Sequence, residues 1–204
     1  AAVFLGGALV VLFGPRTSFE ERWNEPELGP DVDAYLAERE SSVPDLRPGE
    51  AKAVVWTDPE ARASTPIALV YLHGFSADRH EVDPLVSRIA KALGANVFYA
   101  RLTGHGRDGT AMAEATVGAW MDDVAEAVAV GAVLGERVVL IGTSTGGTLA
   151  VWAAARPETE GRVAALVVIS PNFQPRDAAS RILLWPWGAQ LAALVIGRER
   201  CFEP

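Results

Sequence analysis

The residue with the clearest chemical potential in the sequence is Ser144, at the centre of the pentapeptide Gly142–Gly146. The residues before it, 138–141, are apolar and mostly β-branched, which is typical of a buried strand. The residues after it, 147–155, have the composition of a helix. A serine on a sharp strand-to-helix turn, with glycine two residues before and after it, is presented for nucleophilic attack. The pattern therefore predicts Ser144 as a nucleophile and the Thr145 amide, at the helix start, as a donor to an oxyanion.

Two other functions of a glycine-rich turn fit the sequence less well. A turn that only packs, or that binds phosphate, is the alternative to a nucleophile turn. A phosphate-binding Walker loop needs a lysine before its final Ser or Thr, and Gly146-Gly147-Thr148 has none. The glycine spacing of a dinucleotide-binding loop is not met either. Acyl transfer at Ser144 is therefore the favoured chemistry.

The second oxyanion donor is expected in the loop after the first parallel strand. The sequence His73-Gly74-Phe75 occupies that loop, where Gly74 allows a close backbone approach and the Phe75 amide is the candidate donor. We interpret His73 as a structural histidine that fixes the loop by hydrogen bonds, with a catalytic role as the alternative. His105, between two glycines in a tight turn, is expected to be structural too, and His80 to lie in a solvated loop.

The residues that follow Ser144 in the sequence do not supply an evident acid and base to activate it. In this arrangement the order along the chain is serine, then acid, then histidine. No histidine follows Ser144, and the only later aspartate, Asp177, lies in a Pro-rich loop where a triad acid is not expected. We expect the acid and histidine beyond Pro204, with loss of the triad as the alternative. The 204 residues alone are therefore expected to lack efficient turnover.

Strands alternating with helices must position these groups. Strands are expected over residues 52–56, 67–72, 96–100, 138–141 and 162–170. The alternation predicts an α/β fold with a mostly parallel sheet, covered by helices on both faces, whose C-terminal strands are missing. Because the carboxyl ends of parallel strands share one edge, four segments are expected to meet there: 73–75, 104–106, Ser144 and 170–172.

Three helices are expected before Ser144. A short one covers residues 31–40, with Val32, Tyr35 and Leu36 on one face. A second begins at an Asp83 cap with Pro84 in its first position and ends at Gly94, and its apolar stripe is Leu85, Ile89 and Leu93. The third has an apolar stripe of Val117, Trp120, Met121, Val124 and Val128, with Asp122, Asp123 and Glu126 on the solvent side.

The ends of the chain differ from its centre. We expect an apolar anchor or signal remnant over residues 1–14, a linker with a short helix over 15–50, an incomplete α/β core over 51–175, and a lid segment over 176–204. The run 1–13 is shorter than the ~20 residues of a membrane span, so it fits the tail of an anchor or of a signal peptide. A membrane-anchored or exported protein is therefore expected, or a cytoplasmic one if the run belongs to the core. The apolar segment 181–196, broken by Pro186 and Gly188, is interpreted as lid helices, with a core helix or a membrane-dipping segment as alternatives.

Composition excludes several classes of partner. The net charge of −8 and the absence of a basic run argue against nucleic acid. A single cysteine, Cys201, provides no disulfide framework. Cys, His and Asp never cluster at metal-ligand spacing, so no metal is expected. The expected partner is a small acyl ester, with membrane association through residues 1–13 left open and the oligomeric state not indicated.

Three motifs together resemble one known family. The segments H-G-F (His73–Phe75), R-L-T-G-H-G (Arg101–Gly106) and G-T-S-T-G-G (Gly142–Gly147) resemble α/β-hydrolase fold proteins of the carboxylesterase and monoacylglycerol lipase type, and the resemblance runs from about Ala51 to Pro171.

The resemblance implies a serine hydrolase that cleaves carboxylic esters through an acyl-enzyme, without a cofactor. Ser144 would be the nucleophile and the Phe75 and Thr145 amides the oxyanion hole. The supporting motif residues would be His73, Gly74, His105, Gly142 and Gly146. The same scaffold also serves thioesters, amides and lactones. The alternative is a catalytically incomplete protein that acts as a binding module or is inert.

Overall fold

The structure, a computed structural model, describes residues 13–15, 19–174, 181 and 184–196. The chain separates into two compact units, one formed by Glu21–Asn172 and the other by Ala1–Glu20 with Phe173–Pro204. The expectations for the apolar run 1–12, for Asp177 and for Cys201 lie outside the described residues.

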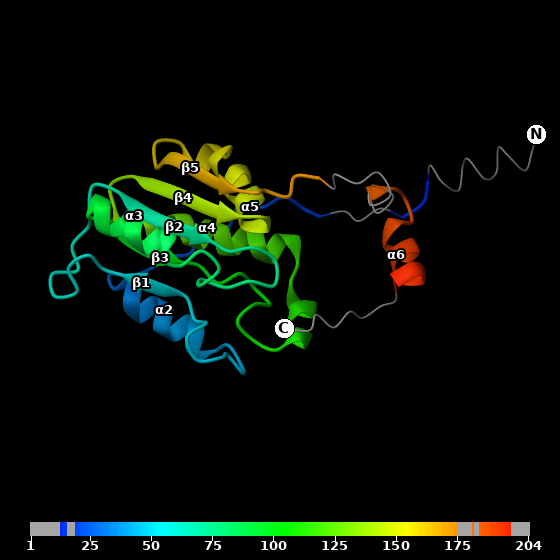
Figure 1. Ribbon diagram of the computed structural model, residues 1–204, viewed down its shortest axis with the longest axis horizontal. Coiled ribbons are helices and arrows are strands. Elements are labelled where there is room, and N and C mark those ends of the chain that lie inside the picture. The colour runs from blue at the N-terminus through cyan, green and yellow to red at the C-terminus, as the bar shows by residue number, and fades with distance from the viewer. Residues whose placement is uncertain (1–12, 16–18, 175–180, 182–183, 197–204) are drawn as a thin grey trace, which may run out of the picture. The chain divides into compact units, whose positions relative to one another are not determined.

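The larger unit is built on one sheet. In the described part of the chain, five strands pair in the order β1-β3-β2-β4-β5 (Figure 1). Their bounds are β1 Ala53–Val55, β2 Ala68–Leu72, β3 Asn96–Tyr99, β4 Val138–Thr143 and β5 Val163–Ile169. Strand β1 runs antiparallel to β3, and the other neighbours are parallel. The predicted mostly parallel α/β sheet is therefore confirmed.

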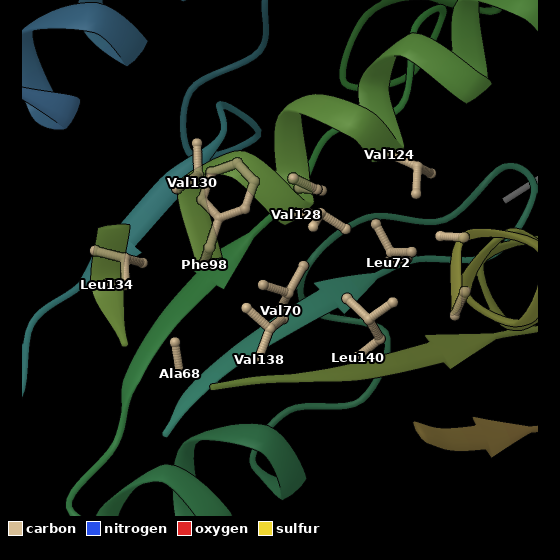
Figure 2. Packing of buried hydrophobic residues seen from close by; sticks show 14 of the residues in the cluster. Ala68, Val70, Leu72, Phe98, Val124, Val128, Val130, Leu134, Val138 and Leu140 are labelled. Atoms are coloured by element: carbon tan, nitrogen blue, oxygen red, sulfur yellow. The ribbon is translucent and has the colours of Figure 1, made fainter. Parts of the chain in front are cut away.

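Helices cover both faces of this sheet. Successive side chains of a strand point to opposite faces, and every residue of β2 is buried. On one face, Val70 and Leu72 join a cluster with residues of α4 (Val117–Leu134) and α5 (Thr145–Ala154). Figure 2 shows Val70 and Leu72 of β2 and Leu140 of β4 on the side of the sheet where Val124 and Val128 of α4 lie. On the other face, Tyr71 packs with α3 (Leu85–Leu93).

Helix α3 begins later than the sequence indicated. Its first residue is Leu85, and Pro84 holds the N-cap position, where no side chain caps the helix. The predicted Asp83 cap is therefore wrong, because the Asp83 carboxylate lies 3.3 Å from the Nδ1 atom of His80 instead. The end of the helix is as predicted, since Gly94 takes the left-handed conformation with φ 60°.

The buried stripe of α3 also differs from the predicted one. Leu85 and Leu93 are 45% and 54% exposed, whereas Val86 and Ala90 are buried against the sheet with Ile89 beside them. Both stripes have helical spacing, so periodicity alone could not choose between them. The contact with the sheet decides which stripe is buried, and it is the one that contains Val86 and Ala90.

The acidic side of α4 is not a solvent-facing side, as the sequence had suggested. The Glu126 side chain is 4% exposed and that of Asp123 is 12% exposed. Glu126 forms an ion pair with Lys52 and accepts a hydrogen bond from the Tyr35 hydroxyl at 2.7 Å. The prediction fails because α2 (Val32–Ser41), which was itself predicted, packs on this side of α4.

Residues 21–30, which were expected within a linker, are held on the sheet-containing unit by ion pairs. Glu21 pairs with Arg156 at 2.8 Å, and Glu25 pairs with Arg162 at 2.7 Å. These side chains are partly exposed, so each pair contributes only about 0–1 kcal/mol to stability. Several such contacts together still fix the path of an extended segment that has no secondary structure of its own.

In the smaller unit, α6 (Gly188–Ile196) provides the helix that was expected within 181–196. The Trp187 amide just before it donates a hydrogen bond to the Pro15 carbonyl at 2.9 Å. Leu194 on this helix is 82% exposed. Its function as a lid stays a prediction. Across the residues that the structure describes, no helix has the length and apolar character needed to cross a membrane.

Candidate active site

Ser144 lies between a strand and a helix with no intervening residue. Strand β4 ends at Thr143 and helix α5 begins at Thr145. Ser144 has φ 48° and ψ −113°, a conformation that costs a non-glycine residue on the order of 1–3 kcal/mol. Its amide donates to the Ile169 carbonyl at 2.9 Å, and its carbonyl accepts from the Thr148 amide at 3.1 Å. The neighbouring strand and the first turn of α5 thus hold the strained residue in place.

Two glycines make this sharp turn possible. A Cβ atom on Gly142 would lie 2.4 Å from the Gly146 carbonyl oxygen, and one on Gly146 would lie 2.0 Å from the Leu72 carbonyl oxygen. Both distances are far below van der Waals contact. Helix α5 therefore approaches β4 and β2 so closely that only glycine fits at either position.

The loop after β2 comes up to Ser144. A Cβ atom on Gly74 would lie 3.4 Å from the Ser144 Cβ atom. Among the described residues, the amides of Phe75 and Thr145 have no hydrogen-bond acceptor. The Thr145 amide is the first of α5, where the helix dipole favours an anion. Neither amide is therefore engaged by another group of the described residues, and their function as oxyanion donors stays a prediction.

His73 has a structural position. Its side chain is buried, its Nε2 atom accepts a hydrogen bond from the Leu102 amide at 3.0 Å, and its Nδ1 atom donates to the Gly74 carbonyl at 2.8 Å. Burial lowers the pKa of His73 from 6.5 to about 4, with the neighbouring His105 adding a smaller effect in the same direction. The ring is neutral at pH 7 and both nitrogens are used by the backbone, so His73 has no nitrogen left for the Ser144 proton.

His105 ties the neighbouring loop to the same place. Its Nε2 atom accepts from the Ser76 amide at 3.1 Å, and its Nδ1 atom donates to the Leu102 carbonyl at 3.2 Å. Its ring contacts the His73 ring at a centroid distance of 4.6 Å. Burial lowers the pKa of His105 as well. The two buried histidines are cross-links between two loops, while His80 is exposed in its loop, as expected.

The loop 101–106 is anchored from two directions. Arg101 forms a bidentate ion pair with Glu40 of α2, at 2.8 and 2.7 Å, and both side chains are 9% exposed. The Thr103 amide donates to the Asp123 carboxylate of α4 at 2.6 Å. The carboxylates of Glu40 and Asp123, for which the sequence indicated no function, therefore hold the loop that carries His105.

Asn172, after β5, completes the ring of segments around Ser144. Its Oδ1 atom accepts from the Thr148 hydroxyl at 2.7 Å, and its Nδ2 group donates to the Thr145 hydroxyl at 3.1 Å. Together with the histidine contacts, these bonds confirm that the loops after β2, β3, β4 and β5 meet at one edge of the sheet.

Two residues at this edge were not singled out by any motif. Glu81 accepts hydrogen bonds from the Gly74 amide at 2.9 Å and from the Tyr71 hydroxyl at 2.7 Å. A loop carboxylate and a strand tyrosine carry no sequence signal of their own, because only the fold brings them to Gly74. Within the described ranges there is no group of three or more His, Cys, Asp or Glu side chains that could hold a metal ion.

The chain is similar in sequence and fold to known hydrolases. The model of the α/β hydrolase fold family matches residues 67–196. A solved structure from work on LipS and LipT, two metagenome-derived lipolytic enzymes, is 27% identical with a TM-score of 0.56, and the match covers 68% of this chain and 52% of that one. A second, an esterase from the anaerobic Clostridium hathewayi that can hydrolyse aliphatic aromatic polyesters, is 17% identical with a TM-score of 0.38 over 72% of this chain and 35% of that one. The chain thus spans about half the length of the first structure, and no curated protein matches it.

Proposed function

Because this chain belongs to the α/β-hydrolase fold family, we propose that the whole protein is a serine hydrolase that cleaves carboxylic esters through an acyl-enzyme on Ser144. The observation that carries the proposal is the position of Ser144, which is held at φ 48° between β4 and the first turn of α5. The similarity to a structure of lipolytic enzymes supports ester bonds as the target. Other acyl groups remain open to the same site, since the fold does not decide the substrate.

The proposed reaction takes its nucleophile and its oxyanion donors from this edge of the sheet. The Ser144 hydroxyl oxygen attacks the ester carbonyl carbon, and its proton passes to a base. The carbonyl oxygen becomes an oxyanion that accepts hydrogen bonds from the Phe75 and Thr145 amides, the proposed oxyanion hole. Preorganised donors of this kind contribute roughly 10²–10³ in rate each. The intermediate then collapses, and the base gives its proton to the leaving oxygen, which departs as the alcohol. In the second half, a water molecule gives a proton to the base and attacks the acyl carbon, and the base returns the proton to the Ser144 oxygen as the carboxylic acid leaves.

The base is proposed to come from outside these 204 residues. His73 and His105 bind backbone groups through both ring nitrogens. No histidine follows Ser144 in the sequence. A triad acid and histidine in the remainder of the protein would complete the site. The same observation favours the second candidate, a hydrolase fold that binds an acyl compound without turning it over.

The acyl chain of the substrate is proposed to be of medium or long length. The support is the apolar character of the smaller unit, where Leu191 and Leu194 of α6 are 37% and 82% exposed. Hydrolysis of esters of increasing chain length by the whole protein tests this point. A rate that rises from acetate to octanoate supports it, and a rate that falls contradicts it.

The experiment that tests the proposal compares two serine variants of the full-length protein. Hydrolysis of p-nitrophenyl butyrate should fall by at least about 10³-fold in Ser144→Ala, because no other group can form the acyl-enzyme. The matched control is Ser87→Ala on α3, whose hydroxyl bonds to the Pro84 carbonyl at 3.0 Å. It should keep the wild-type rate. Unchanged turnover in Ser144→Ala refutes the assignment, and no turnover in the wild-type protein favours the binding function.

A further inference from the structure

A carboxylate that no motif predicted lies beside the proposed nucleophile. Glu81 closes the turn after the H-G-F loop, where its amide donates to the Asp78 carbonyl at 3.2 Å. A Cβ atom on Gly74 would lie 2.9 Å from the Glu81 Oε1 atom and 3.4 Å from the Ser144 Cβ atom. Glu81 and Ser144 therefore border the same glycine.

One oxygen of this carboxylate accepts two hydrogen bonds. Glu81 Oε2 accepts from the Gly74 amide at 2.9 Å and from the Tyr71 hydroxyl at 2.7 Å. The Tyr71 hydroxyl also lies 3.1 Å from the hydroxyl of Thr143, the residue before Ser144. Burial raises the pKa of Tyr71, so its phenol keeps the proton that it donates. These contacts join the loop after β2 to the end of β4.

We propose that Glu81 is a positioning residue for the reaction at Ser144, which holds the Gly74 peptide so that the next amide, that of Phe75, faces the oxyanion. This inference rests on the proposed function. A glycine has no side chain to fix its own orientation, so an external acceptor for its amide restricts the loop. The carboxylate acts through the loop and does not itself contact the reacting atoms.

The charge of Glu81 cannot be the reason for its place. A negative charge near a developing oxyanion opposes it, whatever the effective dielectric constant. The benefit must come from the hydrogen bonds that Glu81 accepts. A glutamine keeps an acceptor oxygen of the same reach without the charge. Glu81→Gln therefore separates the positioning effect from the charge, and Glu81→Ala removes both.

The test measures kcat and KM for p-nitrophenyl butyrate with variants of the full-length protein. In Glu81→Ala, kcat should fall about 10- to 100-fold while KM stays within about threefold of the wild-type value. The reason is that the displaced Phe75 amide would stabilise the transition state and not the bound substrate. Glu81→Gln should keep at least about a third of the wild-type kcat. The matched control is Glu136→Ala, an exposed glutamate before the other end of β4, which should leave both constants unchanged. Thermal unfolding of all variants checks that the fold is intact.

The outcomes separate this inference from the proposed function. A wild-type kcat in Glu81→Ala overturns the positioning role, and so does a change confined to KM. Equal losses in Glu81→Ala and Glu81→Gln overturn it too, because the charge would then be the active feature. Ser144→Ala is measured in the same assay. If it is inactive while Glu81→Ala is fully active, only the inference fails, and if it is active, the proposed function fails.

Discussion

Lowering the pH should destabilise the fold through His73. Burial lowers its pKa from 6.5 to about 4, so protons bind the unfolded chain first as the pH falls. The stabilisation is fully present above pH 6.5 and is lost as the pH falls towards 4. Each unit of difference between the unfolded and folded pKa corresponds to about 1.4 kcal/mol, so the complete loss of folding stability is about 3.4 kcal/mol. Between pH 7 and pH 5, protonation of His73 in the unfolded chain should lower the free energy of unfolding by about 2 kcal/mol.

Urea unfolding, followed by tryptophan fluorescence at pH 7 and pH 5, measures this loss. His73→Gln should lose about 2 kcal/mol less than the wild type over this interval, because it has no imidazole to protonate. The control is His80→Gln, whose exposed ring makes no hydrogen bond to the backbone of the described residues. It should lose as much as the wild type. In the folded protein, the NMR signal of the His73 ring should not shift between pH 8 and pH 5.5, and titration near pH 6.5 would refute the structural role.

Two further predictions concern packing and charge. Gly146→Ala should destabilise the protein by more than about 3 kcal/mol in urea unfolding, because the added methyl carbon would lie 2.0 Å from the Leu72 carbonyl oxygen. The control is Gly109→Ala, where the added methyl group would meet open space, and it should change stability by less than about 0.5 kcal/mol. Lys52→Met should cost about 3–5 kcal/mol, because it leaves buried Glu126 without its main ion pair, and adding Glu126→Leu should recover most of that loss. Arg39→Ala, whose side chain is 62% exposed, should cost less than about 1 kcal/mol. Equal losses in Arg39→Ala and Lys52→Met would contradict the importance of burial.

The strands and the turn around Ser144 could be predicted because their signals are local. Apolar runs mark the strands, and glycines mark the places where the backbone must approach closely or turn. The structural functions of His73 and His105 followed from their neighbouring glycines and from their place after strands. These features depend on residues close together in the sequence, so a single chain is enough to find them.

Features that depend on contacts between distant segments were missed. The burial of Glu126 depends on α2, which lies far before it in the chain. The choice of Val86 over Leu85 as the buried residue of α3 depends on the sheet. Glu81 is close to Gly74 and Tyr71 in the sequence, but only the path of the intervening loop turns its carboxylate back onto both of them. Periodicity places a side chain on a face of its own helix, but only the fold shows what covers that face.

The claim that Ser144 forms the acyl-enzyme is tested by the site at which a fluorophosphonate reacts with the full-length protein. One residue should be phosphonylated in the folded enzyme, peptide mass spectrometry should place it at Ser144, and esterase activity should be lost in proportion to the label incorporated. Ser87→Ala should label as the wild type does, and Ser144→Ala should not label. Label on another residue, or full esterase activity in a protein phosphonylated at Ser144, would contradict the claim.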